Sequence, residues 1–530
     1  MRKRKTIGKI ISILLVLVLS FTVISCDDGS QKAVEFSVWD GTVDTSWYSE
    51  NKTEFALSKA SELAGLAKLV TEEDGNKFEG KTISLGSNID LNNETWTPIG
   101  LYKDENDNDI KKQFSGTFNG NGHTIKGLKI ESTTGASSYR ALFGYVDGTI
   151  KNFTLYGEIS GIDVAGVVAA LDKGGVVDNV TSYVNVSNNN ANATQAKTGG
   201  IVLTIKAKNS KDASWTISNC KNYGAIYSNS TVASDSVGGI LGWTDNQTEK
   251  LTIKNCENYG NVSASKQATG GIVGACRLIT IEDCTNSGAI SSESGDAGGI
   301  VGHNSTTNLT LKNCSNSGSV TGASNKAGAI GGTIRGTLED CTTTKAIALV
   351  GTLGAGSNEN TISYSSETTI VAPSVVKGSL SLKNVKTSAL NLTFVNRAGN
   401  LTFALDSSEI TLMTVTMEKN GAEVPSRLFL TKEGTSSISS LKFTGSFDAQ
   451  NINTYGKLYL FGNEVVAKEN VSNEVIYEER TANNGHPTNA PIYWNATGTK
   501  DSYTDSASES ITSSKTYNST TNQWEETSSN

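Results

Sequence analysis

The chain has 530 residues, with 53 glycines and only 5 prolines, and its formal net charge at pH 7 is −8. This length suits several ordinary domains or one long repeat protein, and the low proline content excludes a proline-rich linker. Removal of the basic leader described next would make the chain still more acidic, so we expect no nucleic acid partner.

The N-terminus has the pattern of a bacterial export signal. Basic residues at 2–9 precede the apolar run 10–24, which is too short to favour a stable membrane span. The run ends in Val23-Ile24-Ser25-Cys26, which resembles a lipobox. That resemblance implies cleavage of a signal peptide at 1–25 and lipidation of Cys26, and several acyl chains anchor a protein stably. We expect an extracytoplasmic protein, lipid-anchored to a bacterial membrane at the cell surface. The alternatives are an ordinary signal peptide and an uncleaved anchor, with a cysteine at this position by chance.

Residues 26–52 are polar and are interpreted as a tether. A helix is expected next, with Ser58 as N-cap, because four apolar residues follow helical spacing. These are Leu63, Leu66, Ala67 and Val70. Strand-like runs follow at 81–85 and 89–91, and residues 53–135 are assigned to an N-terminal cap and the first coils of the repeat fold.

One octapeptide recurs seven times, with spacings of 27, 40, 36, 28, 30 and 27 residues between successive starts. The copies begin at Asn152, Asn179, Asn219, Asn255, Asp283, Asn313 and Asp340. Each unit of about thirty residues also contains β-like runs between glycine and asparagine turns, which predicts three short strands per unit. One unit cannot bury its apolar positions alone, whereas stacked units can. We therefore predict an all-β fold with a right-handed parallel β-helix at 136–350, the hand following the crossover rule.

A second landmark, Gly-Gly-Ile-Val-Gly, occurs at 270–274 and 298–302. These units resemble the GLUG-type repeats of bacterial surface proteins. The resemblance spans about 36–350 and implies a right-handed β-helix on the cell surface, with no catalytic residues carried over. The unit at Gly199 departs from the motif, because Leu203-Thr204 stands where glycine is usual.

Beyond 350 the repeat is lost. Residues 351–480 still alternate like strands, and they form either a continuation of the solenoid or a separate β-rich domain. Residues 481–530 are rich in serine, threonine, asparagine and glutamate, which predicts a disordered tail.

Two positions of the octapeptide predict structure. The second holds cysteine in five copies but Phe153 and Val180 in the first two, so we expect a buried apolar column without metal or disulfide. Cys276 lies outside this column. The leading Asn or Asp is expected to turn a corner in left-handed backbone and to hydrogen-bond to its copies. A metal-binding ladder is the alternative.

The fifth position is the candidate ligand-binding feature. It reads Tyr156, Tyr183, Tyr223 and Tyr259, and then serine or threonine. Four tyrosines in successive coils would form an aromatic stripe. The rings either stack on a sugar chain or pack on one another at a coil corner.

The chain contains only three histidines, His123, His303 and His486, and no Ser/His/Asp or Cys/His set suggests itself. The acidic stretch 104–109 resembles a Ca²⁺ loop but lacks its glycine and closing glutamate. We predict no catalytic residue, no cofactor and no metal site.

The leading hypothesis is a non-enzymatic, adhesin-like scaffold that binds extracellular glycan or a host or cell-surface protein. One alternative is a polysaccharide-degrading lyase or glycoside hydrolase, in which carboxylates would converge in a groove. Its candidates are Asp147, Asp163, Asp172 and Asp178. A structural envelope spacer is a third possibility.

Overall fold

The computed structural model divides the chain into Met1–Glu35 and Phe36–Asn530, and only the second unit is considered below. The described residues are 34–71, 77–103, 109–131, 139–188, 197–206, 213–231, 236–244, 251–304, 309–354, 360–395, 399–418, 426–445, 457–460, 463–471, 474–480, 492–495, 502–504, 514–518 and 523–526. The predicted signal peptide, Cys26 and the acidic stretch 104–108 lie outside them.

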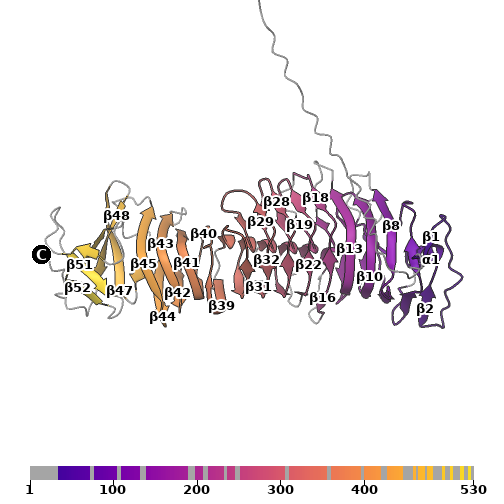
Figure 1. Ribbon diagram of the computed structural model, residues 1–530, viewed down its shortest axis with the longest axis horizontal. Coiled ribbons are helices and arrows are strands. Elements are labelled where there is room, and N and C mark those ends of the chain that lie inside the picture. The colour runs from indigo at the N-terminus through magenta and orange to yellow at the C-terminus, as the bar shows by residue number, and fades with distance from the viewer. Residues whose placement is uncertain are drawn as a thin grey trace, which may run out of the picture. The chain divides into compact units, whose positions relative to one another are not determined.

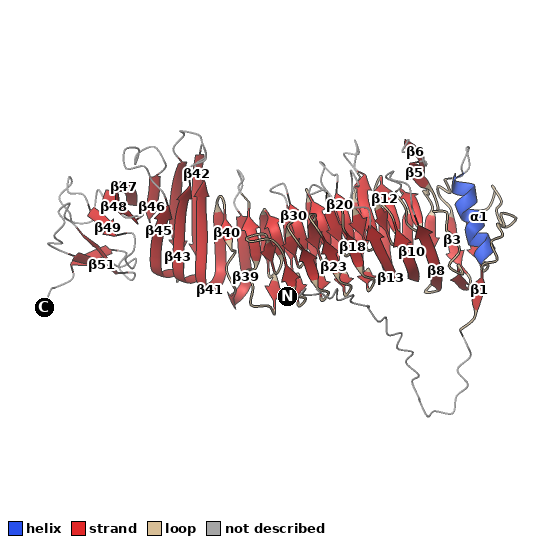
Figure 2. Ribbon diagram, turned by 90° about the horizontal axis from the view of Figure 1, so that it is seen from above, coloured by secondary structure: helices blue, strands red, loops and turns tan. Residues whose placement is uncertain are grey.

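The expected helix is α1 (Ala60–Thr71), which buries Leu63, Leu66, Ala67 and Val70 against the first coils and lies at one end of the stacked strands (Figure 2). It begins two residues after Ser58. Glu62, in its first turn, accepts hydrogen bonds from the amides of Ser58 (2.7 Å) and Lys59 (3.0 Å), so a glutamate caps the helix. In the described part of the chain, no helix has the length and apolarity needed to cross a bilayer.

Parallel strands β1 (Phe36–Val38), β2 (Glu54–Leu57), β3 (Thr82–Leu85) and β4 (Asn88–Asp90) form the first coils. Strands β7 (Thr117–Asn119) and β8 (Thr124–Glu131) continue β3 and β4. They lead into the long strands β10 (Thr149–Ser160) and β13 (Val176–Asn188), which pair in parallel over eleven residues.

Residues 251–276 form one complete coil of the repeat (Figure 1). Its strands are β21 (Leu251–Lys254), β22 (Glu257–Asn258), β23 (Val262–Ala264), β24 (Ala268–Gly270) and β25 (Val273–Cys276). Each pairs in parallel with the equivalent strand of the next coil. These strands are β26 (Ile279–Glu282), β27 (Thr285–Asn286), β28 (Ile290–Ser292), β29 (Ala297–Gly298) and β30 (Val301–Asn304). The fold is thus a parallel β-helix, as predicted. A coil holds five strand segments instead of three, because segments of two or three residues are too short to show alternation in a sequence.

The leading Asn or Asp of all seven octapeptides has left-handed backbone, with φ between 51° and 63°. The side chains also join successive coils. Asn179 Nδ2 donates to Asn152 Oδ1 at 3.0 Å, and Asn255 Nδ2 donates to Asn219 Oδ1 at 3.2 Å. The corner prediction is therefore confirmed. The short side chain that tolerates this backbone also supplies the bond to the next coil.

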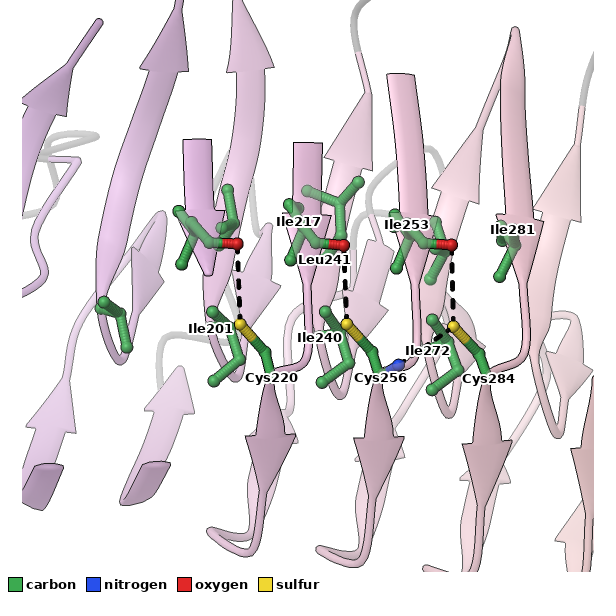
Figure 3. Packing of buried hydrophobic residues seen from close by; sticks show 14 of the residues in the cluster. Ile201, Ile217, Cys220, Ile240, Leu241, Ile253, Cys256, Ile272, Ile281 and Cys284 are labelled. Atoms are coloured by element: carbon green, nitrogen blue, oxygen red, sulfur yellow. Dashed lines mark hydrogen bonds between the residues drawn. The ribbon is translucent and has the colours of Figure 1, made fainter. Parts of the chain in front are cut away.

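The cysteine column lies inside the solenoid (Figure 3). Cys220, Cys256, Cys284, Cys314 and Cys341 are buried and form no disulfide. The thiols donate to backbone oxygens: Cys256 Sγ lies 3.6 Å from Ile217 O, and Cys284 Sγ lies 3.7 Å from Ile253 O. Burial raises the pKa of the Cys256 thiol. The prediction of a buried column is confirmed. Cys276 is also buried, outside the column.

A second internal column was not singled out from the sequence. The fourth octapeptide position carries buried asparagines at 222, 258, 286 and 316. Asn222 Nδ2 donates to Asn258 Oδ1 at 2.8 Å, and the same bond continues to Asn286 and Asn316 at 2.7 Å. Each amide also donates to the carbonyl of the glycine two residues later. A Cβ on Gly260 would lie 1.9 Å from Gly224 O, so this glycine is required by close approach of the coils.

Parallel pairing continues beyond residue 350. One column runs from β36 (Gly336–Glu339) through β39 (Asn360–Thr369), β41 (Leu380–Val395), β43 (Glu409–Glu418) and β45 (Ser437–Gly445). The described strands between residues 351 and 460 therefore continue the parallel pairing of the solenoid.

From β46 (Lys457–Leu460) onward, successive strands pair antiparallel. β46 pairs with β47 (Asn463–Val471), and β47 pairs with β48 (Glu474–Arg480). The described parts of residues 481–530, for which the sequence predicts disorder, lie in the short strands β49 (Ile492–Asn495), β50 (Ser502–Thr504), β51 (Ser514–Asn518) and β52 (Gln523–Glu526). This difference has a local cause. Ile492-Tyr-Trp is a run of strongly β-forming residues within a polar segment.

Candidate functional site: the tyrosine ridge

The four tyrosines of the fifth octapeptide position stack face to face in successive coils. The ring centroids of Tyr156 and Tyr183 are 4.5 Å apart, those of Tyr183 and Tyr223 4.7 Å, and those of Tyr223 and Tyr259 4.6 Å. Neighbouring planes are within 9° of parallel. This arrangement follows from the strand register, in which Tyr156 pairs with Tyr183 and Asn222 pairs with Asn258. We call these four residues the tyrosine ridge.

The stacked rings nevertheless face solvent. Their exposed fractions are 41% for Tyr156, 37% for Tyr183, 38% for Tyr223 and 42% for Tyr259. Stacked carbon atoms already touch at about 3.5–4.0 Å, so no sugar ring can enter between neighbours. The inner rings therefore present edges and hydroxyls, and the two slightly more exposed rings end the ridge. The packing interpretation accounts for the ring faces, and the exposed edges remain open to a ligand.

Tyr259 is followed in its column by the small side chains of Ser287 and Ser317, whose hydroxyls are 3.1 Å apart. The face of the Tyr259 ring that points away from Tyr223 therefore lies beside small serine side chains. We call Ser287 and Ser317 the serine shelf. An aromatic face beside hydroxyls is the arrangement on which a sugar ring can stack while its hydroxyls form hydrogen bonds. Tyr259 is therefore an end ring whose outer face lies beside hydroxyl groups.

Charged groups orient this end of the ridge. The Tyr259 hydroxyl donates to Glu257 Oε2, and Lys221 Nζ lies 3.1 Å from Glu257 Oε1. The bond to Glu257 raises the pKa of Tyr259 to about 12, and the same bond lowers the pKa of Glu257. Desolvation, followed by the neighbouring phenols, raises the pKa of Tyr183. Both phenols therefore stay protonated at neutral pH, and the single hydroxyl proton of Tyr259 is donated to Glu257.

The seventh octapeptide position, two residues after the ridge, is also exposed. Asn185 Oδ1 accepts a hydrogen bond from the Ala225 amide at 3.0 Å, and Asn261 Oδ1 accepts one from the Ala289 amide at 3.0 Å. These bonds join successive coils, as the buried asparagine column does on the inside. The ridge therefore stands on a backbone that is hydrogen-bonded between coils on both of its faces.

An outward threonine row, which was not predicted from the sequence, runs along the strands that precede the octapeptides and along the equivalent strands of the flanking coils. Ten residues pair in register through successive coils, and nine of them are threonine. They are Thr82, Thr117, Thr149, Val176, Thr216, Thr252, Thr280, Thr310, Thr337 and Thr361. Alternating charges lie two residues later, with Lys254 3.5 Å from Glu282 and Lys312 3.2 Å from Glu339. Such cross-strand pairs stabilise the sheet, and the recurring Thr-Ile motif was the available signal.

The four aspartates of the enzyme hypothesis have separate partners. Asp147 accepts from Gln113 (3.3 Å), Asp163 from the Lys197 amide (3.0 Å) and Asp178 from Ser218 (2.7 Å). Asp172 accepts from the Tyr145 hydroxyl at 2.6 Å.

Tyr145 belongs to an aromatic cluster at the first coils. Its ring centroid lies 5.2 Å from that of Tyr102, and Lys206 Nζ lies 5.0 Å from the Tyr102 ring and 4.8 Å from the Tyr139 ring. Desolvation, with the bond to Asp172, raises the pKa of Tyr145 strongly, so its phenol stays protonated and is a poor general base. Lys206 therefore already occupies the position at which these two rings could bind a cation.

The histidines also have ordinary positions. His303 Nδ1 lies 2.9 Å from Asp296 Oδ2, and the Thr333 hydroxyl donates to Asp296 Oδ1 at 2.6 Å. The threonine thus bonds to the carboxylate instead of the imidazole, which is not the order of a nucleophilic triad. His123 lies in a turn, and His486 is outside the described residues. Within the described ranges, no three His, Cys, Asp or Glu side chains are grouped to hold a metal ion.

The fold and its ladders define a parallel β-helix protein with an exposed aromatic ridge. The chain matches no known protein-family model, so the GLUG-type resemblance stays a prediction. It is 29% identical to halomucin of Haloquadratum walsbyi over 174 residues. The matched segment covers 32% of this chain but only 2% of the length of halomucin. A crystal structure described as a candidate immunoglobulin A1 protease from Bacteroides ovatus has 20% identity and a TM-score of 0.39, covering 50% of this chain and 75% of that one.

Proposed function

We propose that the protein is a non-enzymatic, lipid-anchored bacterial surface protein of GLUG type that uses its tyrosine ridge to bind extracellular glycan. The leader ending in Cys26 supports export and anchoring. The similarity to halomucin supports a surface or secreted location. The proposed binding role rests on one observation. Four stacked tyrosines face solvent on strands whose coils are hydrogen-bonded to one another.

The geometry narrows how a glycan would bind. Inner rings offer edges and hydroxyls only, whereas Tyr259 offers a ring face above the shelf of Ser287 and Ser317. A sugar unit on this face would place its hydroxyls near Glu257, a strong acceptor at neutral pH. The rest of the glycan would then run along the serine shelf or along the row of tyrosine hydroxyls.

A glycan-array screen of the mature chain with Cys26→Ser tests this proposal. Glycans bound by the wild type should be lost in the Tyr156/Tyr183/Tyr223/Tyr259→Ala variant. Tyr259→Ala alone should weaken binding about tenfold, and Tyr183→Ala less, because both faces of that ring are already covered.

Tyr227→Ala is the matched control, because Tyr227 is 40% exposed but lies outside the ridge. Circular dichroism should show the same β content in every variant. The proposal fails if no glycan binds the wild type, or if Tyr227→Ala and the ridge variant lose binding equally. Protein partners and the spacer hypothesis would then be tested next.

A further inference from the structure

A cavity of about 430 Å³ opens where the repeat ends, among β37 (Thr342–Thr343), β39 and β41. Two departures from the repeat create it. Lys345 replaces the glycine of the sixth octapeptide position. The β39–β41 register also shifts between Ser363 and Thr368, so that four residues of β39 face one residue of β41. The coils therefore cannot close tightly on each other at this point.

The floor of the cavity is apolar. It is lined by the buried side chains of Cys341, Leu349, Tyr364 and Ile370. The one polar side-chain group with strong bonding capacity here, the Tyr364 hydroxyl, already donates to Cys341 O at 2.6 Å. Burial raises the pKa of this phenol, so it stays neutral. At this floor, the free energy of ligand binding would come mainly from the burial of apolar surface.

The rim is polar and carries two ammonium groups. Thr342, Thr369, Ser388 and Thr411 contribute hydroxyls. Lys386 Nζ lies 2.8 Å from Glu409 Oε2, so its charge is already matched. Lys345 is exposed on the same rim, and no ion pair involves it within the described part of the chain.

We propose that this cavity binds a small amphipathic organic anion, with its apolar body on the floor and its acidic head at Lys345. The volume falls within the roughly 300–1,000 Å³ of ordinary ligand sites, and apolar walls with a few convergent polar groups are their usual composition. The unpaired ammonium selects a negative head, since a charge-assisted hydrogen bond is about twice as strong as a neutral one. This site is separate from the tyrosine ridge and does not depend on the proposed glycan binding.

Calorimetric titration of the mature chain, with Cys26→Ser, against decanoate and decanol tests the proposal. Decanoate should bind saturably at one site, and decanol, which has the same apolar chain without the charge, should bind more weakly. Lys345→Gln should weaken decanoate about tenfold and leave decanol unchanged. Lys383→Gln is the control, because Lys383 lies on β41 outside the cavity lining and pairs with Asp406 at 3.1 Å.

A second variant, Ser388→Trp, fills the cavity from its exposed rim and should abolish binding of both compounds. Circular dichroism and the unfolding temperature should stay close to those of the wild type. Absence of saturable decanoate binding would overturn the proposal. So would equal decanoate affinity in the wild type and Lys345→Gln, or full binding in Ser388→Trp. Ridge variants such as Tyr259→Ala should leave decanoate affinity unchanged.

Discussion

The repeat coils at 152–347 and the coils that follow at 360–445 use the same parallel pairing but different interiors. Repeat coils bury columns of asparagine and cysteine beside their aliphatic residues, and the asparagines bond from coil to coil. The later coils bury aliphatic residues, for example Leu382, Leu390 and Met413. A hydrogen-bonded column needs the same residue in every coil, whereas an apolar column accepts exchange. The buried asparagine column ends at Asn316, one octapeptide before the visible repeat ends, and the parallel pairing of the solenoid continues without it.

The largest expected effect comes from breaking the buried asparagine column. Asn258→Ala removes the partner of Asn222 Nδ2 and the donor to Asn286 Oδ1, both buried. Leaving such groups unsatisfied should lower the free energy of unfolding by about 3 kcal/mol. Urea denaturation measures this change. Asn261→Ala, at an exposed position of the same coil, should cost less than about 1 kcal/mol. Equal losses would show that the buried column is not what distinguishes the repeat coils.

The cysteine column should behave as apolar packing. Cys284→Val should change the free energy of unfolding by less than about 1.5 kcal/mol, because valine is similar in volume and Val180 occupies the same octapeptide position. Cys284→Asp should be far more destabilising, since it buries a charge. Thiol labelling with a disulfide reagent should be negligible in the native state at pH 8 and complete after unfolding. Rapid native labelling would contradict a closed interior.

The smallest effect concerns pH. The folded pKa of Tyr259 is about 12, above the unfolded value of about 10. The stabilisation is therefore fully present below pH 10 and is lost as the pH rises towards 12. Tyr259→Phe removes the phenol, so the wild type should lose more stability than this variant between pH 10 and 12. Denaturation curves across that range measure the difference, and identical slopes would argue against the bond to Glu257.

The octapeptide alone predicted the coil, its left-handed Asn and Asp corners and its buried cysteines, because each depends on residue type at a recurring position. The tyrosine column was also visible in the sequence. The sequence did not show which parts of the rings a ligand can contact. The ring faces are covered only when residues 27 to 40 positions apart come into register.

The coil interior and its later course were decided by tertiary structure. The sequence did not single out Asn222 and Asn258, yet stacking of the coils buries them as hydrogen-bond partners. Parallel pairing after 350 and the cavity beside Lys345 depend on the register between strands that share no repeat. Local patterning determines which residues turn, alternate and point inward, whereas contacts between coils decide which of them meet.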